Sequence, residues 1–325
     1  MSERIDLAQA LKRNWTALVP YIVFIALTAI MVSVQPGTLG FGYMATKMDA
    51  AITLVLVTAG QTIVLVSGGF DLSVGGVVCV TNSLVAVNMQ DSPESILGWA
   101  LISLLIGAGI GFFNGFVVAR TRMQPFIVTL VTLSVCQGWA LLILRVDGGS
   151  VPGAVASFFM HRVGGILPVS FFAIVLLIAW WLFFKRTPTG LALYMVGCNP
   201  NAARLNGISL TKMYILAYTV SGLFAAFAGI YRTALVASGS PTAGTAFTML
   251  SICAAVIGGT AISGGAGGIV GGVFGALIMR GITEILVFLH VSSYLTLLVQ
   301  GLLLILAVTI TSYAQLRKKK RGGRQ

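Results

Sequence analysis

The sequence predicts an all-α protein that crosses a membrane about ten times. Only 9% of its 325 residues are charged and 57% are hydrophobic, whereas about 25% of a soluble domain is charged. The apolar runs are continuous and about 20 residues long, which suits membrane helices better than the alternating strands of a β-barrel. Glycine, with 39 residues, is common where membrane helices pack closely. These observations exclude a water-soluble enzyme and a disordered chain.

Ten apolar runs are long enough to cross a bilayer. In chain order they cover residues 15–34, 50–66, 72–89, 96–119, 125–144, 166–184, 213–237, 247–263, 268–289 and 294–313. Glycine clusters interrupt the second, third, eighth and ninth runs, and any of these is a candidate for a broken or re-entrant helix. We therefore predict one transmembrane domain over residues 15–313, preceded by a short segment (1–14) and followed by a basic tail (314–325).

The basic residues predict the orientation of the chain. With ten spans, the N-terminal segment, the loop 185–212 and the tail share one side of the membrane and hold most of the 20 Lys and Arg residues. The opposite side receives Lys47, Arg145, Arg162 and Arg232. Because cytoplasmic loops are rich in Lys and Arg, both termini are predicted to be cytoplasmic. A basic tail next to the membrane is attracted to anionic lipid, so the net charge of +12 does not require a nucleic acid.

The motifs of several enzyme classes are missing. The sequence has no G-x-x-x-x-G-K-[ST] loop for ATP, no G-x-S-x-G elbow and no H-E-x-x-H metal motif. We expect no catalytic residue, no metal and no cofactor on this chain. Its few intramembrane charges offer little to a proton or sodium relay. The chain is therefore predicted to form a passive pathway that another component drives, and a secondary transporter or channel that works alone is the alternative.

The loop 185–212 contains a short helix with its own stop signals. Asn199 is a favoured N-cap, Pro200 suits the first helical position, and Gly207 suits a left-handed end. A helix of two turns is unstable alone and must pack against something. We interpret it as a rigid knob that docks on a partner, and an ordinary surface helix is the alternative. The knob comprises Asn199, Pro200, Asn201, Ala202, Ala203, Arg204, Leu205, Asn206 and Gly207.

This loop resembles the cytoplasmic loop of ribose-type permeases of ATP-binding-cassette importers. The family pattern is T-x-x-G-x-x-x-x-A-x-G-x-N-x-x-A-A-x-x-x-G-I. The chain departs from it at Met195, where the family has alanine. It matches at Thr187, Gly190, Gly197, Asn199, Ala202, Ala203, Gly207 and Ile208.

Three other segments are similar to the same family. GGFDLSVGG (68–76) resembles its GGIDLSVG signature, with Phe70 in place of isoleucine. Asn114 with 125–130 resembles its N…PFI-x-TL block, and 254–260 with 264–265 resembles its AAVxxGGT…GG block. The resemblance implies the type II (vitamin-B12-type) permease fold in a bacterial inner membrane. It also implies a periplasmic sugar-binding protein, a second permease subunit, and two ATPase subunits or one fused tandem ATPase that binds ATP-Mg.

One departure from the family concerns acidic residues. The family has Y-E-L-D-A-I where this chain has residues 247–252, and Thr248 and Leu250 replace the two acids. If those carboxylates bind substrate or gate the pathway in relatives, that role is absent or altered here. A heterodimer whose other subunit carries the acids is one explanation, so both a homodimer and a heterodimer remain open.

Polar residues inside the spans are candidates for the pathway, because sugars need hydrogen-bond donors and acceptors. Each could equally bond one helix to another. In GGFDLSVGG, Asp71 is positioned to cap the helix that follows, either as a simple turn or as a hinge beside the pathway. Arg280 and Glu284 are four residues apart and are expected to pair. The pathway and gating candidates are Phe70, Asp71, Ser73, Asn82, Asn114, Gln137, Thr248 and Ser251.

Two glycine ladders are typical of close helix packing. The first is Gly107, Gly111 and Gly115. The second is Gly267, Gly271 and Gly275. We expect both to pack helices within one subunit, and a seam between two subunits is the alternative.

Overall fold

The computed structural model describes residues 7–121 and 123–292, and then residues 295–296, 298–302, 305 and 309. Most of the predicted tenth span, the basic tail and residues 1–6 lie outside the described residues. The elements are α1 (Leu7–Val34), η1 (Pro36–Leu39), α2 (Phe41–Val66), α3 (Val74–Asn88), α4 (Pro93–Arg120), α5 (Pro125–Ile143), α6 (Gly153–Phe159), β1 (Arg162–Val163), β2 (Leu167–Pro168), α7 (Val169–Phe184), α8 (Pro188–Cys198), α9 (Pro200–Leu205), α10 (Leu210–Val236), α11 (Thr245–Ile257) and α12 (Ile269–Phe288).

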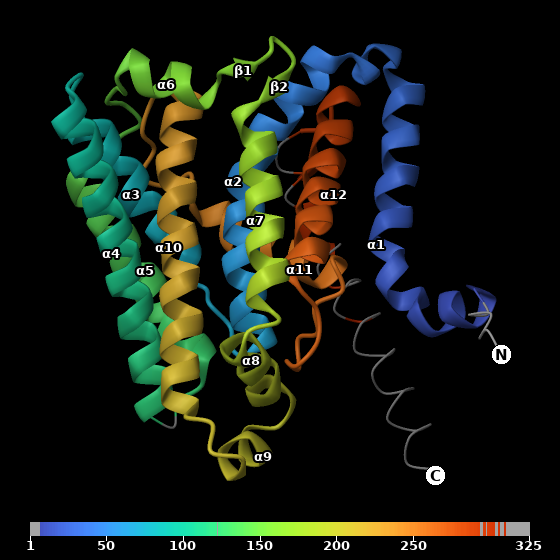
Figure 1. Cartoon of the computed structure of the whole chain (residues 1–325). Coiled ribbons are helices and arrows are strands. Elements are labelled where there is room, and N and C mark those ends of the chain that lie inside the picture. Colours follow the sequence, from blue (N-terminus) through green and yellow to red (C-terminus); the bar gives the residue numbers. More distant parts are fainter. Residues whose placement is uncertain are drawn as a thin grey trace.

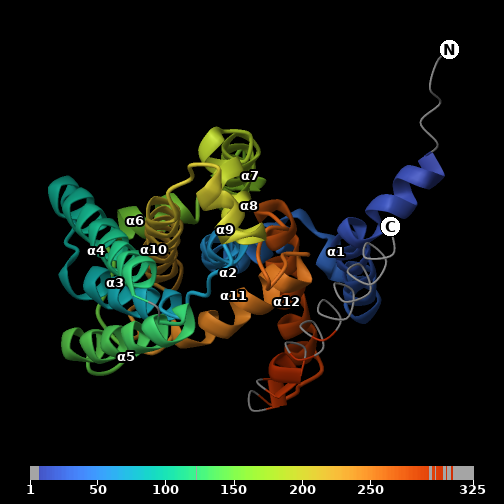
Figure 2. The same cartoon turned by 90° about the horizontal axis from the view of Figure 1, so that it is seen from below.

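The long helices run side by side between two ends of the molecule (Figure 1). We call these the α6 end, which also carries β1 and β2, and the α9 end, which also carries α8. Helix α2 lies in the middle, with α4 and α5 to one side and α12 and α1 to the other (Figure 2). Its apolar stretch is 94% buried, as expected for a helix that is hydrophobic all round. Helix α2 packs against α7, α10, α11 and α12, whereas α4 and α5 pack against α10 and α3, and α1 packs against α12.

Helix α2 begins at Phe41 rather than at the predicted residue 50. The prediction was wrong because Lys47 and Asp49 interrupt the apolar run. In the structure Lys47 pairs with Glu284 and Asp49 pairs with Arg162, so both charges are accommodated within the helix.

Five helices are long and apolar enough to cross a membrane, or six if α7 and α8, which meet at 79°, form one bent span. These numbers refer to the described residues and do not confirm a count of ten. Of the four glycine-interrupted runs, α2 and α12 are continuous. Helices α3 and α11 have only 15 and 13 residues, too few to cross about 30 Å of hydrocarbon. Helix α11 ends at Ile257 instead of residue 263, because Gly258 and Gly259 follow and Gly259 has a φ of +88°.

The two glycine ladders pack helices within this chain. A Cβ atom added at Gly111 would collide with the backbone of Tyr218, and one added at Gly107 would collide with Gly222, both on α10. A Cβ at Gly271 would likewise collide with Gly258, at the end of α11. The ladder in α4 therefore brings α10 into close contact, and the ladder in α12 does the same for α11.

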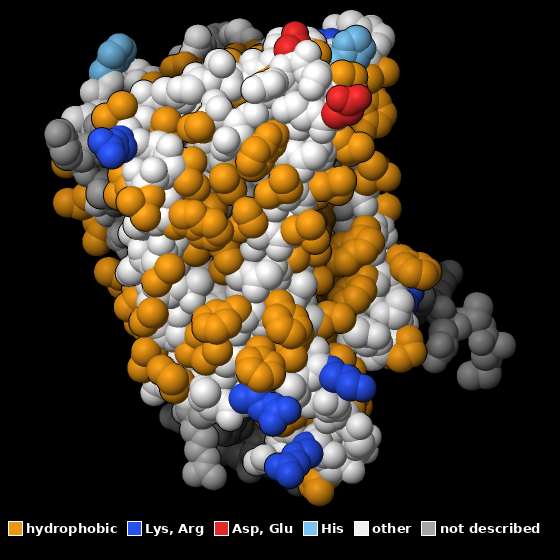
Figure 3. Space-filling model, turned by 90° about the vertical axis from the view of Figure 1, so that its left-hand side faces the viewer, with side chains coloured by type: hydrophobic (Ala, Val, Ile, Leu, Met, Phe, Trp, Pro, Cys, Tyr) orange, Lys and Arg blue, Asp and Glu red, His pale blue; other side chains and the backbone are white. Residues whose placement is uncertain are grey.

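Hydrophobic and basic side chains occupy different parts of the surface of the bundle (Figure 3). Hydrophobic side chains cover the side face that carries α4, while Lys and Arg side chains gather towards the α9 end. Helix α4 is only 17% buried over its apolar stretch and α5 only 28%. An apolar belt of this kind is the surface that a multi-pass membrane protein presents to lipid.

We expect Gly111→Ala to destabilise the fold, because its methyl group has no room against the α10 backbone. Overpacking of this kind costs about 1–3 kcal/mol. Gly109→Ala is the matched control on the same helix, since nothing lies within 4 Å of its added Cβ. Thermal unfolding of the detergent-solubilised chain measures both, and equal melting temperatures for the two variants would contradict the packing assigned to this ladder.

Candidate functional site

The site is built around the loop 67–73, which joins α2 to α3 and which we call the Asp71 loop. Asp71 is 1% exposed. Its Oδ1 accepts hydrogen bonds from the Ser73 backbone N–H (3.0 Å) and the Ser73 hydroxyl (2.5 Å). Its Oδ2 accepts one from the Ser221 hydroxyl of α10 (2.8 Å). Asp71 thus accepts from the N–H two residues on, but the N-cap of α3 is Ser73, which makes no side-chain cap bond, so Asp71 is not the cap that the sequence predicted. The third donor comes from α10.

Asn114 and Thr132 extend this network to α4 and α5. The Asn114 amide nitrogen donates to Ser73 Oγ (2.9 Å), and the Thr132 hydroxyl donates to Asn114 Oδ1 (2.6 Å). Both Ser73 and Asn114 are buried. Two of the segments that carry the family resemblance, 68–76 and Asn114 with 125–130, thus meet at one hydrogen-bonded cluster.

The backbone carbonyls of the Asp71 loop also have side-chain partners. Phe70 O accepts from the Tyr218 hydroxyl (3.0 Å) and the Thr129 hydroxyl (3.4 Å). Leu72 O accepts from the Thr248 hydroxyl of α11 (3.3 Å). Non-helical backbone is tolerated at membrane depth only where such partners satisfy it. The loop is therefore fixed by α4, α5, α10 and α11 together.

The structure brings five of the eight pathway candidates to this cluster and separates three. Phe70, Asp71, Ser73, Asn114 and Thr248 meet there. The other three, which are Asn82, Ser251 and Gln137, take part in none of its hydrogen bonds.

Asn82 instead donates to the Thr233 hydroxyl (2.8 Å) and accepts from the Ser240 N–H (2.6 Å). Ser251 is buried and donates to Thr248 O within its own helix. Gln137 is half-buried on α5, and within the described residues its side chain has no hydrogen-bond partner. Asn82 and Ser251 thus bond helix to helix or within a helix, which is the alternative that the sequence left open.

The sequence did not point to several residues that complete the site. Ser221 and Tyr218 are three residues apart on α10 and share a helix face, yet only the fold shows that this face meets the Asp71 loop.

A second buried carboxylate, Asp49, was also missed. Its Oδ2 lies 2.8 Å from Arg162 Nη1, and its Oδ1 accepts from Ser170 (2.6 Å). An acid inside an apolar run is itself a signal that could have found it.

The expected pair between Arg280 and Glu284 is corrected by the structure. Glu284 lies 3.4 Å from Lys47 Nζ and accepts a hydrogen bond from the Tyr43 hydroxyl. Tyr43 and Lys47 both belong to α2. Glu284 therefore links α12 to α2 instead of pairing with Arg280 on its own helix. Within the described residues Arg280 has no ion-pair partner, and its side chain is exposed.

The knob in the loop 185–212 forms as a capped helix. Asn199 Oδ1 accepts from the N–H groups of Asn201 and Ala202, both at 3.1 Å. Gly207, with a φ of +79°, ends the helix, and Ile208 N–H donates back to Ala203 O (3.1 Å). Ala203 is buried, whereas Leu205 is 89% exposed. The caps satisfy the ends of the short helix and Leu205 projects from the surface, but the docking role of the knob remains a prediction.

Behind the knob, three segments meet at a glycine junction formed by Gly68, Gly197, Gly264 and Gly265. Gly265 N–H donates to Val66 O at the end of α2 (2.9 Å). A Cβ atom at Gly197, near the end of α8, would collide with both Val66 and Gly265. The Tyr194 hydroxyl of α8 donates to Gly267 O (2.6 Å). The junction therefore places the end of α8, the start of the Asp71 loop and the α11–α12 loop in direct contact.

Comparison with known proteins supports the resemblance seen in the sequence. The chain is 33% identical over 300 residues to the ribose import permease protein RbsC of Escherichia coli strain K12, which covers 90% of this chain and 93% of that protein. It is 35% identical over 260 residues to the D-allose transport system permease protein AlsC of the same strain, covering 79% of each. The galactose/methyl galactoside import permease protein MglC of that strain is 28% identical over 318 residues, covering 92% of this chain and 95% of that protein.

No solved structure matches the chain. The sequence profile of a permease family matches residues 43–308, which include the Asp71 loop, the knob and the glycine junction. The chain therefore belongs to the family described as "Branched-chain amino acid transport system / permease component".

Proposed function

We propose that the chain is the permease subunit of an ATP-driven importer that passes a monosaccharide from a binding protein into the cytoplasm. The observation that carries this proposal is the alignment over most of the chain with permeases named for ribose, allose and galactose. The family description names amino acids, but these relatives favour a sugar. The chain serves as a pathway, and the chemical step of ATP hydrolysis belongs to another subunit.

We propose that the α9 end faces the cytoplasm and the α6 end faces outwards. The charges support this orientation. Lys185 and Arg186 follow α7, Arg204 lies in α9 and Lys212 lies in the first turn of α10, all at the α9 end. Asp91, Glu94 and Asp147 lie in or beside connections at the α6 end. Counting α3 and α11 as broken spans and residues 294–313 as a final span gives the ten crossings and returns the C-terminus to the cytoplasm.

The knob is the proposed contact with the ATPase. Two ATPase subunits, or one fused tandem ATPase, would bind ATP-Mg and receive the knobs of two permease subunits. The exposed Leu205 and the capped backbone suit a small rigid insert. Movement of the knob reaches α8 directly, then the glycine junction, and through Gly68 the Asp71 loop. We propose this route as the link between ATP hydrolysis and the pathway.

Thr248 alters the site where relatives carry an acid. Its hydroxyl donates to the carbonyl of Leu72, and an ionised carboxylate has no proton to donate in this way. In this chain the position therefore fastens α11 to the Asp71 loop. This is consistent with a heterodimer whose other subunit keeps the acids, and with a homodimer that does without them.

Co-purification of the tagged chain tests the proposed function. We expect an ATPase and a second permease subunit to accompany it, and cells that hold the complete importer to take up a radiolabelled monosaccharide such as ribose, allose or galactose. Uptake that persists after the accompanying ATPase is inactivated would favour a stand-alone transporter or channel instead.

Ser221→Ala is expected to reduce uptake through the Asp71 loop. It removes one of the three donors to Asp71, and the loss of such a buried bond to a carboxyl group costs about 1.5–3 kcal/mol. Thr233→Val is the matched control, because it removes a buried hydroxyl from the same helix but one that bonds Asn82. Uptake per folded transporter is measured for both. An equal loss in the two variants would mean that the loop has only a structural role.

Gly207→Pro is expected to uncouple ATP hydrolysis from uptake. Proline fixes φ near −65° and cannot adopt the left-handed conformation at Gly207 (φ +79°), so the end of the knob must change. Gly207→Asn is the control, since asparagine tolerates that conformation. The ratio of ATP hydrolysed to sugar imported is measured in vesicles. An unchanged ratio in the proline variant would refute the assignment of the knob.

A further inference from the structure

A cluster of charges near the α6 end takes no part in the proposed pathway. It consists of Tyr43 and Lys47 on α2 with Arg280 and Glu284 on α12. Lys47 and Tyr43 both engage Glu284. Arg280 is about 12 Å from the last residue of α12, at 1.5 Å per residue, so it lies within the membrane-embedded part of that helix. Two cations therefore face one carboxylate at this depth.

No other acid in the described part of the chain neutralises Arg280. Asp49 pairs with Arg162 and Asp71 bonds Ser73 and Ser221. Asp91 and Asp147 lie in the connections before α4 and after α5, and Glu94 lies in the first turn of α4. The remaining acids, Glu3 and Asp6, precede α1. An unpaired cation is costly inside a membrane, so the counter-charge of Arg280 comes from outside these residues.

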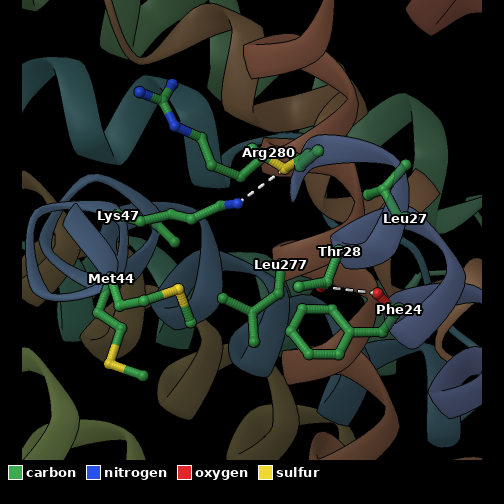
Figure 4. Close-up of a pocket in the computed structure, with 11 residues that line it drawn as sticks. Phe24, Leu27, Thr28, Met44, Lys47, Leu277 and Arg280 are labelled. Atoms are coloured by element: carbon green, nitrogen blue, oxygen red, sulfur yellow. Dashed lines mark hydrogen bonds between the residues drawn. The ribbon is translucent and has the colours of Figure 1, made fainter. Parts of the chain in front are cut away.

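Two adjoining pockets share Lys47 and Arg280, and Figure 4 shows the first of them. The first is an open groove between α1, α2 and α12, with an empty volume of about 490 Å³ that includes the open space at its mouth. Apart from the two cations it is largely apolar, and its lining includes Phe24, Leu27, Met31, Met44, Met48 and Leu277. The second has an empty volume of about 330 Å³ and is lined by Tyr43, Thr46, Lys47, Ala50, Arg280 and Glu284. Together they form an apolar slot that opens beside a cationic patch.

We propose that these pockets hold one anionic phospholipid. Its phosphate lies against Arg280 and Lys47, and part of an acyl chain occupies the slot between α1 and the α2–α12 pair. The phosphate supplies the counter-charge that the described acids do not, because a cluster of basic side chains at the membrane attracts anionic headgroups. A free anion would fill the cationic patch but would leave the apolar slot empty. The lipid thus bridges α1 to the core of the bundle.

The test uses the full chain, purified in a neutral detergent and stripped of lipid. Dioleoyl phosphatidylglycerol, dioleoyl phosphatidylcholine and glycerol phosphate are added separately, and the melting temperature is followed against concentration. Because a ligand that binds only the folded state stabilises it, we expect phosphatidylglycerol to raise the melting temperature and the other two to leave it nearly unchanged. An equal rise with phosphatidylcholine would indicate non-specific lipid. An equal rise with glycerol phosphate would indicate a site for small anions. Either result overturns the proposal.

Substitutions locate the site. Arg280→Gln is expected to weaken phosphatidylglycerol binding by about tenfold or more, the value for losing one charge-assisted hydrogen bond. Arg120→Gln is the matched control, because Arg120 ends α4 at the α9 end, and neither pocket contains it. Equal affinities in the two variants would refute the site. The comparison of the three additives uses the unaltered chain, so it decides the question even if Arg280→Gln does not fold.

Discussion

The burial of one carboxyl group, that of Asp71, determines how the centre of this protein is assembled. A carboxyl group is costly to remove from water unless its oxygens are hydrogen-bonded. Asp71 has three donors, two from Ser73 and one from Ser221. Ser73 lies in the Asp71 loop and Ser221 lies in α10. The carboxyl group therefore has all its hydrogen bonds only when α10 packs against the loop at this position. Asn114 of α4 then donates a hydrogen bond to Ser73. The helices can therefore pack in this arrangement only when the hydrogen bonds of the site form.

A loop at this depth has consequences for the helices around it. Where α2 stops at Val66, its last carbonyls lose their helical partners, and Gly265 N–H takes up that of Val66. Tyr218 and Thr248 satisfy the carbonyls of Phe70 and Leu72. The α11–α12 loop thus takes up the carbonyl of Val66, while the carbonyls of Ile63, Val64 and Leu65 accept from the N–H groups of residues 67–69. The short helices α3 and α11 follow from the same arrangement, because each begins or ends at a loop that lies inside the bundle.

The sequence predicted features that depend on residues close together in the chain. It missed contacts between residues that are far apart in the chain. Asn199 and Gly207 marked the knob because caps act within a few residues. Glycines four residues apart marked one face of α4 as a close packing surface, although only the structure shows that α10 is the helix that meets it. The partner of Glu284 was mistaken because Lys47 is remote in sequence. Ser221 reaches Asp71 only because α10 passes beside the Asp71 loop. The spacing of residues along the sequence does not reveal that contact. The start of α2 was misplaced because charges that look exposed in a sequence are paired in the fold.

The position of α2 restricts where this protein can move. A helix buried on all sides cannot slide without disturbing every neighbour, because packed interiors are close to crystalline density. The helix is also tied at Asp49, two turns from its start, by Arg162 and Ser170, and at its last residue, Val66, by Gly265. Displacement of the knob must then be taken up outside α2 and the equally buried α3, at the α11–α12 loop that contacts α8 through the glycine junction. The Asp71 loop lies between the two buried helices, so a displacement reaches it through the partners that hold it, which include Thr248 of α11.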